Sequence, residues 1–533
     1  MRIGLACFAA SAVVIVSVWA WLGASVPMPH APLKPGEKLY CLSYAPYRAG
    51  QTPFDTSTVI PAAQIDEDMA QLAKVTDCVR IYALDQGLDQ VPPLAAKHGL
   101  KVLMGIWPSK DHPDKTALQV ASAVRLAQQY PDTIRAVVVG NEVLLRGEMT
   151  GADLAAMIRS VKAQVKVPVT YADVWEFWLR NPAVAAAADF ITIHILPYWE
   201  DFPVPAEQAA DHVAAIRARV ASTFPGKEIL IGEVGWPSAG RMREGALPSP
   251  ANQARVIQDV LALAKQEHFH VNVIEAYDQP WKRALEGTVG GHWGLLDAGT
   301  RRPKFVWGEA VSNHPGWRWQ AAGGVVFAAA VFGAALLARR KEGAPPPLWF
   351  AVTANATVGG ILIGWTIANV SIESFDAGGL LRALGLAAVA LTSPIVASAA
   401  IMRGAPIPRF SEVLARRDER IPDRLAVALG VVTVATMLLA VQSALGLTFD
   451  PRYKDFPFAA MTAAVLPLLL HSLIVPRPPG TRGAAELAAA VVLVLSVIYI
   501  VPDESLANWQ SLWLCAAFIG LALTLVRVRG VSR

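Results

Sequence analysis

Two short segments of this chain place an acidic side chain directly after an apolar run. Gly140-Asn141-Glu142 follows the apolar residues 136–139, and Gly232-Glu233-Val234-Gly235-Trp236-Pro237 follows residues 229–231. An apolar run that ends in glycine and an acid is typical of a buried strand that presents the acid at its C-terminal end. In a (β/α)8 barrel, the C-terminal ends of the strands form the active-site face.

Two carboxylates at such a face are sufficient to cleave a glycosidic bond. One protonates the leaving oxygen, and the other attacks the anomeric carbon or activates water. We assign Glu142 as the acid/base and Glu233 as the nucleophile, because the fourth and seventh strands lie across a barrel and their tips can converge. Asn141 is placed to bond the sugar 2-hydroxyl. Neither carboxylate role needs a metal, so we expect no cofactor.

The elements that would position these residues alternate between strand-like and helix-like segments. Apolar residues recur at helical spacing between the strand-like runs, as in Ile65, Met69 and Leu72. Periodicity does not show closure, but acids on the fourth and seventh strands favour a (β/α)8 TIM barrel over an open α/β sheet. The expected strands are 38–46, 78–83, 101–108, 134–142, 167–173, 189–199, 228–237 and 272–280, within a domain spanning 38–312.

The rest of the chain has the composition of a membrane protein. Hydrophobic residues make up 54% of the sequence and charged residues 17%, and the apolar excess lies beyond Gln320. Residues 1–24 predict an N-terminal transmembrane anchor, and the proline-rich residues 25–37 a linker. An all-α polytopic membrane domain is expected over 317–533, with seven spans at 320–338, 348–370, 380–402, 425–447, 457–475, 484–501 and 509–526.

Charge in the loops between these spans alternates. Basic residues gather at 339–341, 403–424, 477–482 and 527–533, and acidic residues in the other loops. Basic loops face the cytoplasm, which predicts cytoplasmic termini and a barrel on the other side. We expect a multi-pass protein of a Gram-negative inner membrane, with a periplasmic barrel and contact with membrane lipid. The net charge of +4 is small, so no nucleic-acid partner is expected.

Further motifs stand at or after other expected strands. They are Leu42-Ser43-Tyr44-Ala45-Pro46, Arg80-Ile81-Tyr82, Pro197-Tyr198-Trp199, Glu275-Ala276-Tyr277-Asp278-Gln279-Pro280-Trp281-Lys282 and His292-Trp293-Gly294-Leu295. Together with the two acidic segments, they resemble glycoside hydrolase family 17, the retaining β-1,3-glucan-active enzymes of clan A, over roughly residues 38–310. One position departs from the family, which commonly has an acidic residue where Gln279 stands.

The resemblance implies a substrate-binding set that comprises Tyr44, Arg80, Tyr82, Asn141, Tyr198, Trp199, Trp236, Glu275, Trp281 and Lys282. A buried arginine must be paired, which makes Arg80 the expected partner of Glu233. Tyr198 is a candidate donor to Glu233, with a structural role as the alternative. Each aromatic residue near a strand end would stack on glucose or simply pack. We interpret His98 and His194 as core or surface histidines, not as ligands or bases.

Two other groups of residues allow two interpretations each. Cys41 and Cys78, expected on adjacent strands, would form a disulfide if the domain is exported, and two buried thiols are the ordinary alternative. The polar residues Asn355, Asn369, Gln442 and His471 fall at or toward membrane depth. Uncharged polar residues in spans often tie helices together, and we favour that role over a transport pathway.

The sequence therefore predicts a membrane-bound retaining hydrolase or transglycosylase that trims, branches or cyclises periplasmic β-glucan beside a β-glucan synthase. A rival hypothesis is a glucan-binding or export component without turnover, although such a protein has no need of both acids. A cellulase or mannanase of the same clan is a second rival. The membrane spans would serve as an anchor or as a dock for the synthase.

Overall fold

The computed structural model describes residues 2–339, 344–414, 423–475 and 483–527. The chain forms two compact units, one comprising Met1–Ser25, Gly240–Glu244 and Ser312–Arg533, the other Val26–Ala239 and Gly245–Val311. Most basic residues of the loops predicted to be cytoplasmic lie outside the described residues: Arg340, Lys341, Arg416, Arg417, Arg420, Arg477, Arg482, Arg529 and Arg533.

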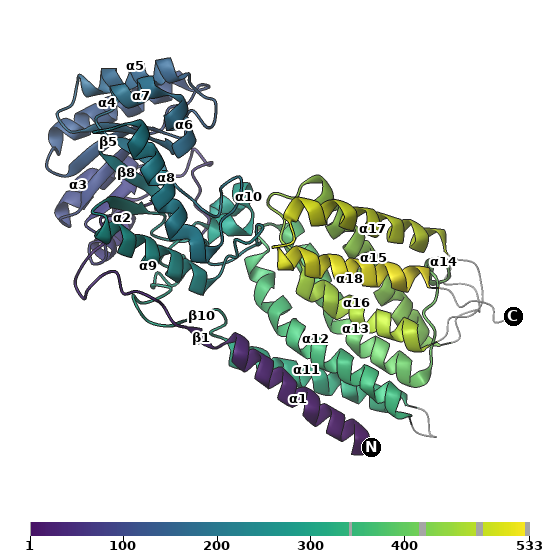
Figure 1. The fold of residues 1–533 in the computed structure, drawn as a ribbon. Helices are drawn as coiled ribbons and strands as arrows, with labels where there is room; N and C mark the ends of the chain where they lie inside the picture. The colour runs from purple at the N-terminus through teal and green to yellow at the C-terminus, as the bar shows by residue number, and fades with distance from the viewer. Residues whose placement is uncertain (1, 340–343, 415–422, 476–482, 528–533) are drawn as a thin grey trace. The chain divides into compact units, whose positions relative to one another are not determined.

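The second unit is a closed barrel of eight parallel strands (Figure 1), which confirms the predicted fold class. Its strands pair in chain order, and the last pairs with the first. They are β2 (Cys41–Ser43), β3 (Cys78–Ile81), β4 (Lys101–Ile106), β5 (Ile134–Asn141), β6 (Val169–Val174), β7 (Ile191–His194), β8 (Ile229–Val234) and β9 (His270–Val273).

Amphipathic helices follow the strands because their apolar stripes pack on the outside of the barrel. In α2, for example, Ile65, Met69 and Leu72 are buried. Thr150 caps α5 by accepting a hydrogen bond from the backbone of Asp153, as its sequence position predicts. The barrel helices are α2 (Ala62–Leu72), α3 (Val91–Lys97), α4 (Pro113–Gln129), α5 (Gly151–Lys162), α6 (Trp175–Arg180), α7 (Pro182–Ala187), α8 (Ala209–Thr223) and α9 (Pro250–Gln266).

The last strand is much shorter than the predicted 272–280, because β9 ends at Val273. Beyond that point the backbone bonds are divided: Ala276 N–H still donates to the Ser43 carbonyl of β2. Glu275 N–H instead donates to the Trp293 carbonyl, and Asp278 N–H to the Leu296 carbonyl, both in a later loop. The motif residues 275–282 therefore belong to a loop and the short 3-10 helix η3 (Pro280–Lys282), not to a strand.

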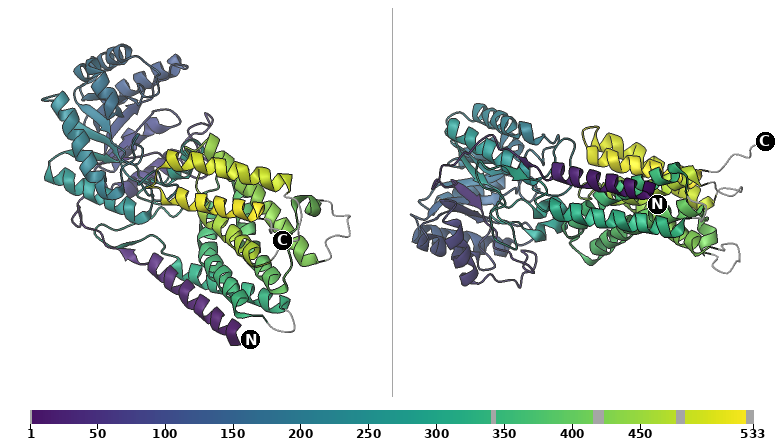
Figure 2. Two further views of the ribbon diagram at one scale, coloured as in Figure 1. Left: turned by 45° about the vertical axis from the view of Figure 1, so that its right-hand side comes forward. Right: turned by 90° about the horizontal axis from the view of Figure 1, so that it is seen from below.

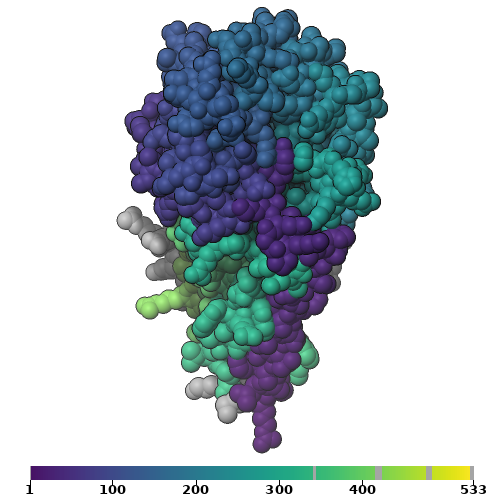
Figure 3. All heavy atoms as spheres, turned by 90° about the vertical axis from the view of Figure 1, so that its left-hand side faces the viewer, coloured from purple at the N-terminus to yellow at the C-terminus, as the bar shows by residue number. Residues whose placement is uncertain are grey.

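Cys41 of β2 and Cys78 of β3 are joined by a disulfide across 37 residues of chain. The alternative of two buried thiols is therefore wrong. Residues 26–38, which precede β2, run over the surface of the barrel unit (Figure 3), and this agrees with a linker that enters the domain.

The first unit is helical. It contains α1 (Arg2–Leu22), α11 (Trp317–Ala338), α12 (Pro346–Ile372), α13 (Ala377–Arg403), α14 (Phe410–Leu414), α15 (Arg424–Phe449), α16 (Phe458–Ile474), α17 (Ala484–Glu504) and α18 (Trp509–Val526). Within the described residues, seven helices are long and apolar enough to cross a membrane, and α16 is a shorter apolar helix. These eight coincide with the predicted spans. In both views of Figure 2, α1 runs alongside α11 and α12.

Of the four polar residues predicted to tie helices together, two bond outside their own helix. Asn355 of α12 donates to the Ser398 hydroxyl of α13 at 3.0 Å, and the His471 ring bonds the Ala405 carbonyl at 2.8 Å. Asn369 is an exception, because it bonds Glu373 on its own helix at 3.0 Å. Gln442 is another, since its side chain is exposed.

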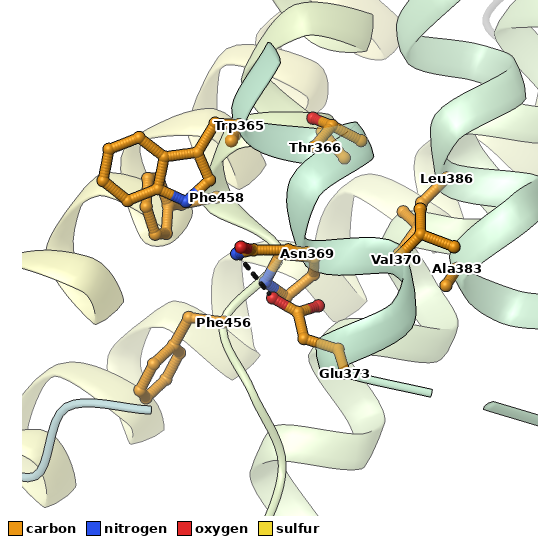
Figure 4. Close-up of a pocket in the computed structure, with 12 residues that line it drawn as sticks. Trp365, Thr366, Asn369, Val370, Glu373, Ala383, Leu386, Phe456 and Phe458 are labelled. Carbon is orange, nitrogen blue, oxygen red and sulfur yellow. Dashed lines mark hydrogen bonds between the residues drawn. The ribbon is translucent and has the colours of Figure 1, made fainter. Parts of the chain in front are cut away.

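Asn369 and Glu373 line a small pocket between α12, α13 and the start of α16 (Figure 4). Trp365 and Phe458 border the same pocket. Its cavity volume is about 30 Å³, which is room for about one water molecule. The pocket is therefore far too small for a sugar ring.

Candidate active site

The structure brings the two predicted catalytic carboxylates together. Glu233 lies in β8, and Glu142 directly follows β5. Carboxylate oxygens of Glu142 and Glu233 and a ring nitrogen of His194 all lie within 4.8 Å of one another. The Glu142 side chain is 24% exposed and the Glu233 side chain 6%. The pair therefore sits at the barrel mouth, with the predicted acid/base nearer to solvent.

Glycine is needed beside both acids. Gly140 has φ +93°, and a Cβ there would lie 2.6 Å from Val143 Cγ2. A Cβ on Gly232 would lie 2.4 Å from Thr192 Cγ2. Glu142 itself has φ +54°, a left-handed conformation that is uncommon for glutamate and frequent at functional sites. The glycine in each motif therefore makes the close turn or approach that places the acid.

Arg80 of β3 is the buried partner of Glu233, which confirms that prediction. Its Nη1 donates to Glu233 Oε1 at 3.2 Å and to the Gly232 carbonyl at 2.6 Å. Its Nη2 donates to Asn141 Oδ1 at 2.5 Å. Arg80 is 1% exposed, so these bonds compensate a charge that water does not reach. One guanidinium thus connects the motifs of β5 and β8.

Tyr82 donates a hydrogen bond to Glu233, whereas the sequence named Tyr198 as the candidate tyrosine donor. The Tyr82 hydroxyl lies 2.9 Å from Glu233 Oε1 and 2.8 Å from Ser43 Oγ. Asn272 of β9 donates to the same Ser43 oxygen at 2.8 Å. Tyr82 was predicted only as a substrate-binding residue. Its bond fixes one oxygen of the nucleophile.

Tyr198, the predicted donor to Glu233, is fully buried. Its ring packs edge-on against Trp199, Trp236 and Trp293. That setting agrees with the structural alternative, and the bond to Glu233 remains a prediction.

His194, which sequence reasoning set aside, lies at the centre of the site. It ends β7 and is 1% exposed. Its Nδ1 lies 2.8 Å from Glu142 Oε1, and its Nε2 lies 3.3 Å from both Arg80 Nη atoms and 3.6 Å from Glu233 Oε1. The core-or-surface interpretation is wrong for His194. It holds for His98, which bonds Asp66 in a partly exposed pair at 2.7 Å.

The charge state of Glu142 follows from these neighbours. Burial alone would raise the pKa of Glu142, but the hydrogen bond from His194 and the nearby charges of Arg146 and Arg80 outweigh burial. The pKa of Glu142 is therefore lowered from its ordinary value.

Asp173, near the end of β6, is a further buried carboxylate that sequence reasoning missed. It accepts hydrogen bonds from the Tyr171 hydroxyl and, at 2.7 Å, from the Val174 backbone. Burial raises the pKa of Asp173 to about 6, and the charge of Glu142 adds to this. The signal that could have found both Asp173 and His194 is a polar residue at the C-terminal end of a barrel strand.

Glu275 and Lys282 form one buried ion pair, with Lys282 Nζ 2.9 and 3.0 Å from the two Glu275 oxygens. Burial raises the pKa of Glu275 to about 7, against the effect of Lys282. Gln279 accepts a hydrogen bond from the Trp281 indole at 2.6 Å and donates to the Ala45 carbonyl at 2.9 Å. The residue that departs from the family pattern therefore holds the Trp281 ring in place.

The predicted aromatic residues divide into two groups. Tyr44 is 1% exposed, and its hydroxyl donates to Asp68 of α2 at 2.9 Å. Trp236 is fully buried, and its indole donates to the Leu247 carbonyl at 3.1 Å. Both side chains pack inside the barrel unit, and their contact with sugar remains a prediction. Trp199 and Trp281 are partly exposed and remain candidates for stacking on glucose.

Arg146 and Trp107 form a cation–π pair near the site. The Arg146 guanidinium stands over the Trp107 ring at 4.3 Å and donates to Glu148 at 2.8 Å. Because Arg146 also interacts electrostatically with Glu142, this group is beside the predicted proton donor.

The cluster of Glu142, His194 and Glu233 has the donor types of a metal site. However, Arg80 donates to Glu233 and lies 3.3 Å from His194 Nε2. A guanidinium thus already supplies positive charge at this place. The expectation that the site needs no metal stays a prediction.

Comparison with known proteins gives the class of this barrel. Residues 41–294 match the family model of the BtgE/BtgC glycoside hydrolase domain. A "Glucan 1,3-beta-glucosidase" of Arthroderma benhamiae is 28% identical over 262 residues, which cover 46% of this chain and 83% of the relative. A "Probable beta-glucosidase btgE" of Neosartorya fischeri is 29% identical over 267 residues, 48% of this chain and 46% of the relative.

Among solved structures, a glycoside hydrolase family 17 beta-1,3-glucanosyltransferase from Rhizomucor miehei is similar. It is 25% identical with a TM-score of 0.44, over 50% of this chain and 95% of that one. The barrel is thus the catalytic domain of a glycosidase or transglycosidase. More particularly, the match of residues 41–294 to the BtgE/BtgC glycoside hydrolase model and the names of the curated relatives agree with the resemblance to family 17. The match ends before the C-terminal helices begin.

Proposed function

We propose that this chain is a membrane-embedded, retaining enzyme that remodels exported β-1,3-glucan by trimming, branching or cyclising it. The observation that carries the proposal is the proximity of Glu142 and Glu233, whose nearest oxygens lie within 4.8 Å. Retaining glycosidases hold their two carboxyl groups about 5–5.5 Å apart, whereas inverting enzymes leave about 6.5–9.5 Å for a water molecule.

The two oxygens of Glu233 differ in their hydrogen bonds, and this difference suits nucleophilic attack. Oε1 accepts from Arg80 and Tyr82. Among the described residues, Oε2 has no hydrogen-bond partner. In the first step, Oε2 forms a bond to the anomeric carbon while the bond to the leaving oxygen breaks and Glu142 protonates that oxygen. The product is a glucosyl-enzyme ester.

The second step reverses these roles. Glu142, now a carboxylate, takes a proton from water or from a sugar hydroxyl, whose oxygen attacks the anomeric carbon and releases Glu233. Its lowered pKa keeps Glu142 in the ionised form that this step requires. Water gives hydrolysis, and a sugar hydroxyl gives a longer, branched or cyclic glucan.

Asn141 is suited to recognise the sugar in the donor site. Its Oδ1 accepts from Arg80, which orients the amide and leaves its Nδ2 as a donor without a partner among the described residues. A hydrogen bond from Nδ2 to the 2-hydroxyl would strengthen as the ring approaches an oxocarbenium ion.

The substrate and its linkage are inferred from the relatives. The curated relatives are named for glucan 1,3-beta-glucosidase activity, and residues 41–294 match the family model. Because the family match excludes the helical unit, the action of the whole chain is our inference. Cellulose or mannan as the substrate is the rival within the same clan.

Two features support a membrane location with the barrel outside the cytoplasm. The seven long apolar helices expose large apolar side chains, such as Leu337 at 91% and Phe449 at 82%, which suits contact with lipid. The Cys41–Cys78 disulfide suits an oxidising compartment such as the periplasm. Membrane lipid and a β-glucan synthase are the partners we propose.

The test uses the full chain in lipid nanodiscs, incubated with linear β-1,3-gluco-oligosaccharides and, in parallel, with cello-oligosaccharides. We expect products of altered length or linkage from the β-1,3 substrates, and none from Glu233→Gln. Turnover of cello-oligosaccharides alone would refute the proposed substrate. Binding without turnover by the wild-type chain would favour the glucan-binding and export hypothesis.

A further inference from the structure

Both ring nitrogens of His194 face groups of the catalytic site. Nδ1 lies 2.8 Å from Glu142 Oε1. Nε2 lies 3.3 Å from Nη1 and from Nη2 of Arg80. The ring thus bridges the predicted acid/base and the arginine that holds the nucleophile.

These contacts select one tautomer of the imidazole. A guanidinium can only donate hydrogen bonds, so the Nε2 that faces Arg80 must be the acceptor. The ring proton is then on Nδ1, from which it donates to Glu142 Oε1. A neutral imidazole has one donor and one acceptor nitrogen, and this arrangement uses both.

We propose that His194 is a positioning residue that makes the two oxygens of Glu142 unequal, so that Oε2 alone carries the transferred proton. The inference rests on the retaining function proposed above. An oxygen that already accepts the His194 N–H is a poor place for a proton. Among the described residues, Oε2 of Glu142 has no hydrogen-bond partner, and it is the oxygen left to face a glycosidic bond.

The same bond serves both steps of the reaction. In the first step, the proton leaves from Oε2 while the His194 N–H stabilises the negative charge that develops on the carboxylate. In the second step, Oε2 takes a proton from the attacking hydroxyl, and Oε1 remains bonded to His194.

Several charged or titratable groups face His194 and Glu142, and each of them affects how activity depends on pH. Arg80 comes from β3, Arg146 from the loop after β5, Asp173 from β6 and Glu233 from β8. Tyr171 of β6 and the partly buried carboxylate Glu286 also interact with Glu142 electrostatically. A variant that changes only the Nδ1 donor of His194 leaves all these groups in place.

A matched pair of variants tests the contacts of the two ring nitrogens of His194 one at a time. The amide of asparagine can place an N–H near the position of Nδ1, whereas the amide of glutamine reaches the position of Nε2. His194→Asn therefore keeps the bond to Glu142, and His194→Gln keeps the contact with Arg80. The readout is the pH profile of kcat/KM for the full chain in nanodiscs, whose alkaline limb reports loss of the proton from the general acid.

The expected result is a shift of the alkaline limb to higher pH by about one unit in His194→Gln, because burial then raises the pKa of Glu142 without the opposing bond. We expect kcat to fall about 10- to 100-fold in this variant. His194→Asn should keep the wild-type limb. An equal shift in both variants, or a shift in neither, would overturn the proposal.

A measurement on the wild-type chain covers the case in which a variant does not fold. Solid-state NMR of ¹⁵N-histidine in lipid should show a protonated Nδ1 and an unprotonated Nε2 for the ring whose Nδ1 is close to a glutamate carboxyl carbon. The opposite tautomer would overturn the inference. If the wild-type chain turns over no glucan, the proposed function fails, whereas an unshifted glutamine variant of an active enzyme refutes the role of His194 alone.

Discussion

The barrel mouth and the helical unit both bury polar side chains, but they use them differently. In the helical unit, Asn355 bonds Ser398, and the Ser393 hydroxyl donates to the Ala464 carbonyl at 2.6 Å. Such bonds join neighbouring helices and leave the pairs inside packed protein. At the barrel mouth, Glu142 and Glu233 each have one bonded oxygen and one oxygen without a partner among the described residues.

This difference distinguishes polar residues that stabilise the fold from polar residues that are placed to act on a substrate. Burying a polar group is unfavourable unless it is hydrogen-bonded. The helical unit uses neutral pairs such as Asn355 and Ser398 as well as a buried charged pair, Arg241 and Glu504. The barrel mouth instead holds two carboxylates. Each has one oxygen fixed by hydrogen bonds and one oxygen without a partner among the described residues. The barrel mouth differs because its two carboxylates lie within 4.8 Å of each other and the Glu142 side chain is 24% exposed.

The largest difference in activity between variants of the two regions is expected when a carboxylate of the barrel mouth is replaced. Glu233→Gln should lower kcat for β-1,3-gluco-oligosaccharides by about a thousandfold or more, because no covalent intermediate can form. The matched control, Asn355→Ala in the helical unit, should leave kcat within about twofold. Steady-state kinetics of both full-length variants in nanodiscs tests this, and equal losses of activity would remove the distinction between the two regions.

The role of Glu142 can be separated from that of Glu233 by chemical rescue. Glu142→Ala should lose about 100-fold or more in kcat, and azide should restore turnover with formation of a β-glucosyl azide. Azide needs no base and attacks the glucosyl-enzyme at the face vacated by the leaving sugar. Mass spectrometry and NMR identify the product. Rescue of a Glu233 variant to the β-azide would reverse the assignment.

The Cys41–Cys78 disulfide belongs to the barrel but, unlike the mouth, should affect stability and not catalysis. Closing 37 residues of chain stabilises a fold by about 3–4 kcal/mol in the chain-entropy model. A double Cys→Ala variant should unfold at lower temperature while kcat stays within about threefold. Thermal unfolding and kinetics in nanodiscs measure both, and unchanged stability would contradict this expectation.

A smaller effect is expected from Asp173. Burial raises the pKa of Asp173 to about 6, whereas an unfolded chain releases that proton near pH 3.9. Between these values the folded state binds more protons, so stability falls as pH rises from about 4 to about 6. Asp173→Asn should remove this loss, at most about 3 kcal/mol. Thermal unfolding of the variant and the wild type at pH 4 and pH 7 provides the comparison, and an identical pH dependence in both proteins would count against it.

The sequence was sufficient for the fold class and for the two carboxylates that the structure brings together. Glu142 and Glu233 were found because an acid after an apolar run marks the active end of a barrel strand. Arg80 was found because a buried arginine needs a partner. The apolar helices were found because composition and length alone define them.

Other features depend on contacts that a single sequence does not contain. His194 was misjudged because its partners, Glu142 and Arg80, lie 52 and 114 residues away. The predicted strand 272–280 was too long because residues 275–278 pair with the loop 293–296, and such pairing has no local signal. The disulfide required the register of neighbouring strands.

Our central claim is that Glu142 and Glu233 act as a retaining pair on β-1,3-glucan. The most direct measurement is ¹H NMR of the first products formed when the full chain, in nanodiscs, cleaves laminari-oligosaccharides, before mutarotation mixes the anomers. We expect the β-anomer to appear first. Initial release of the α-anomer would mean a single inverting displacement and would contradict the mechanism.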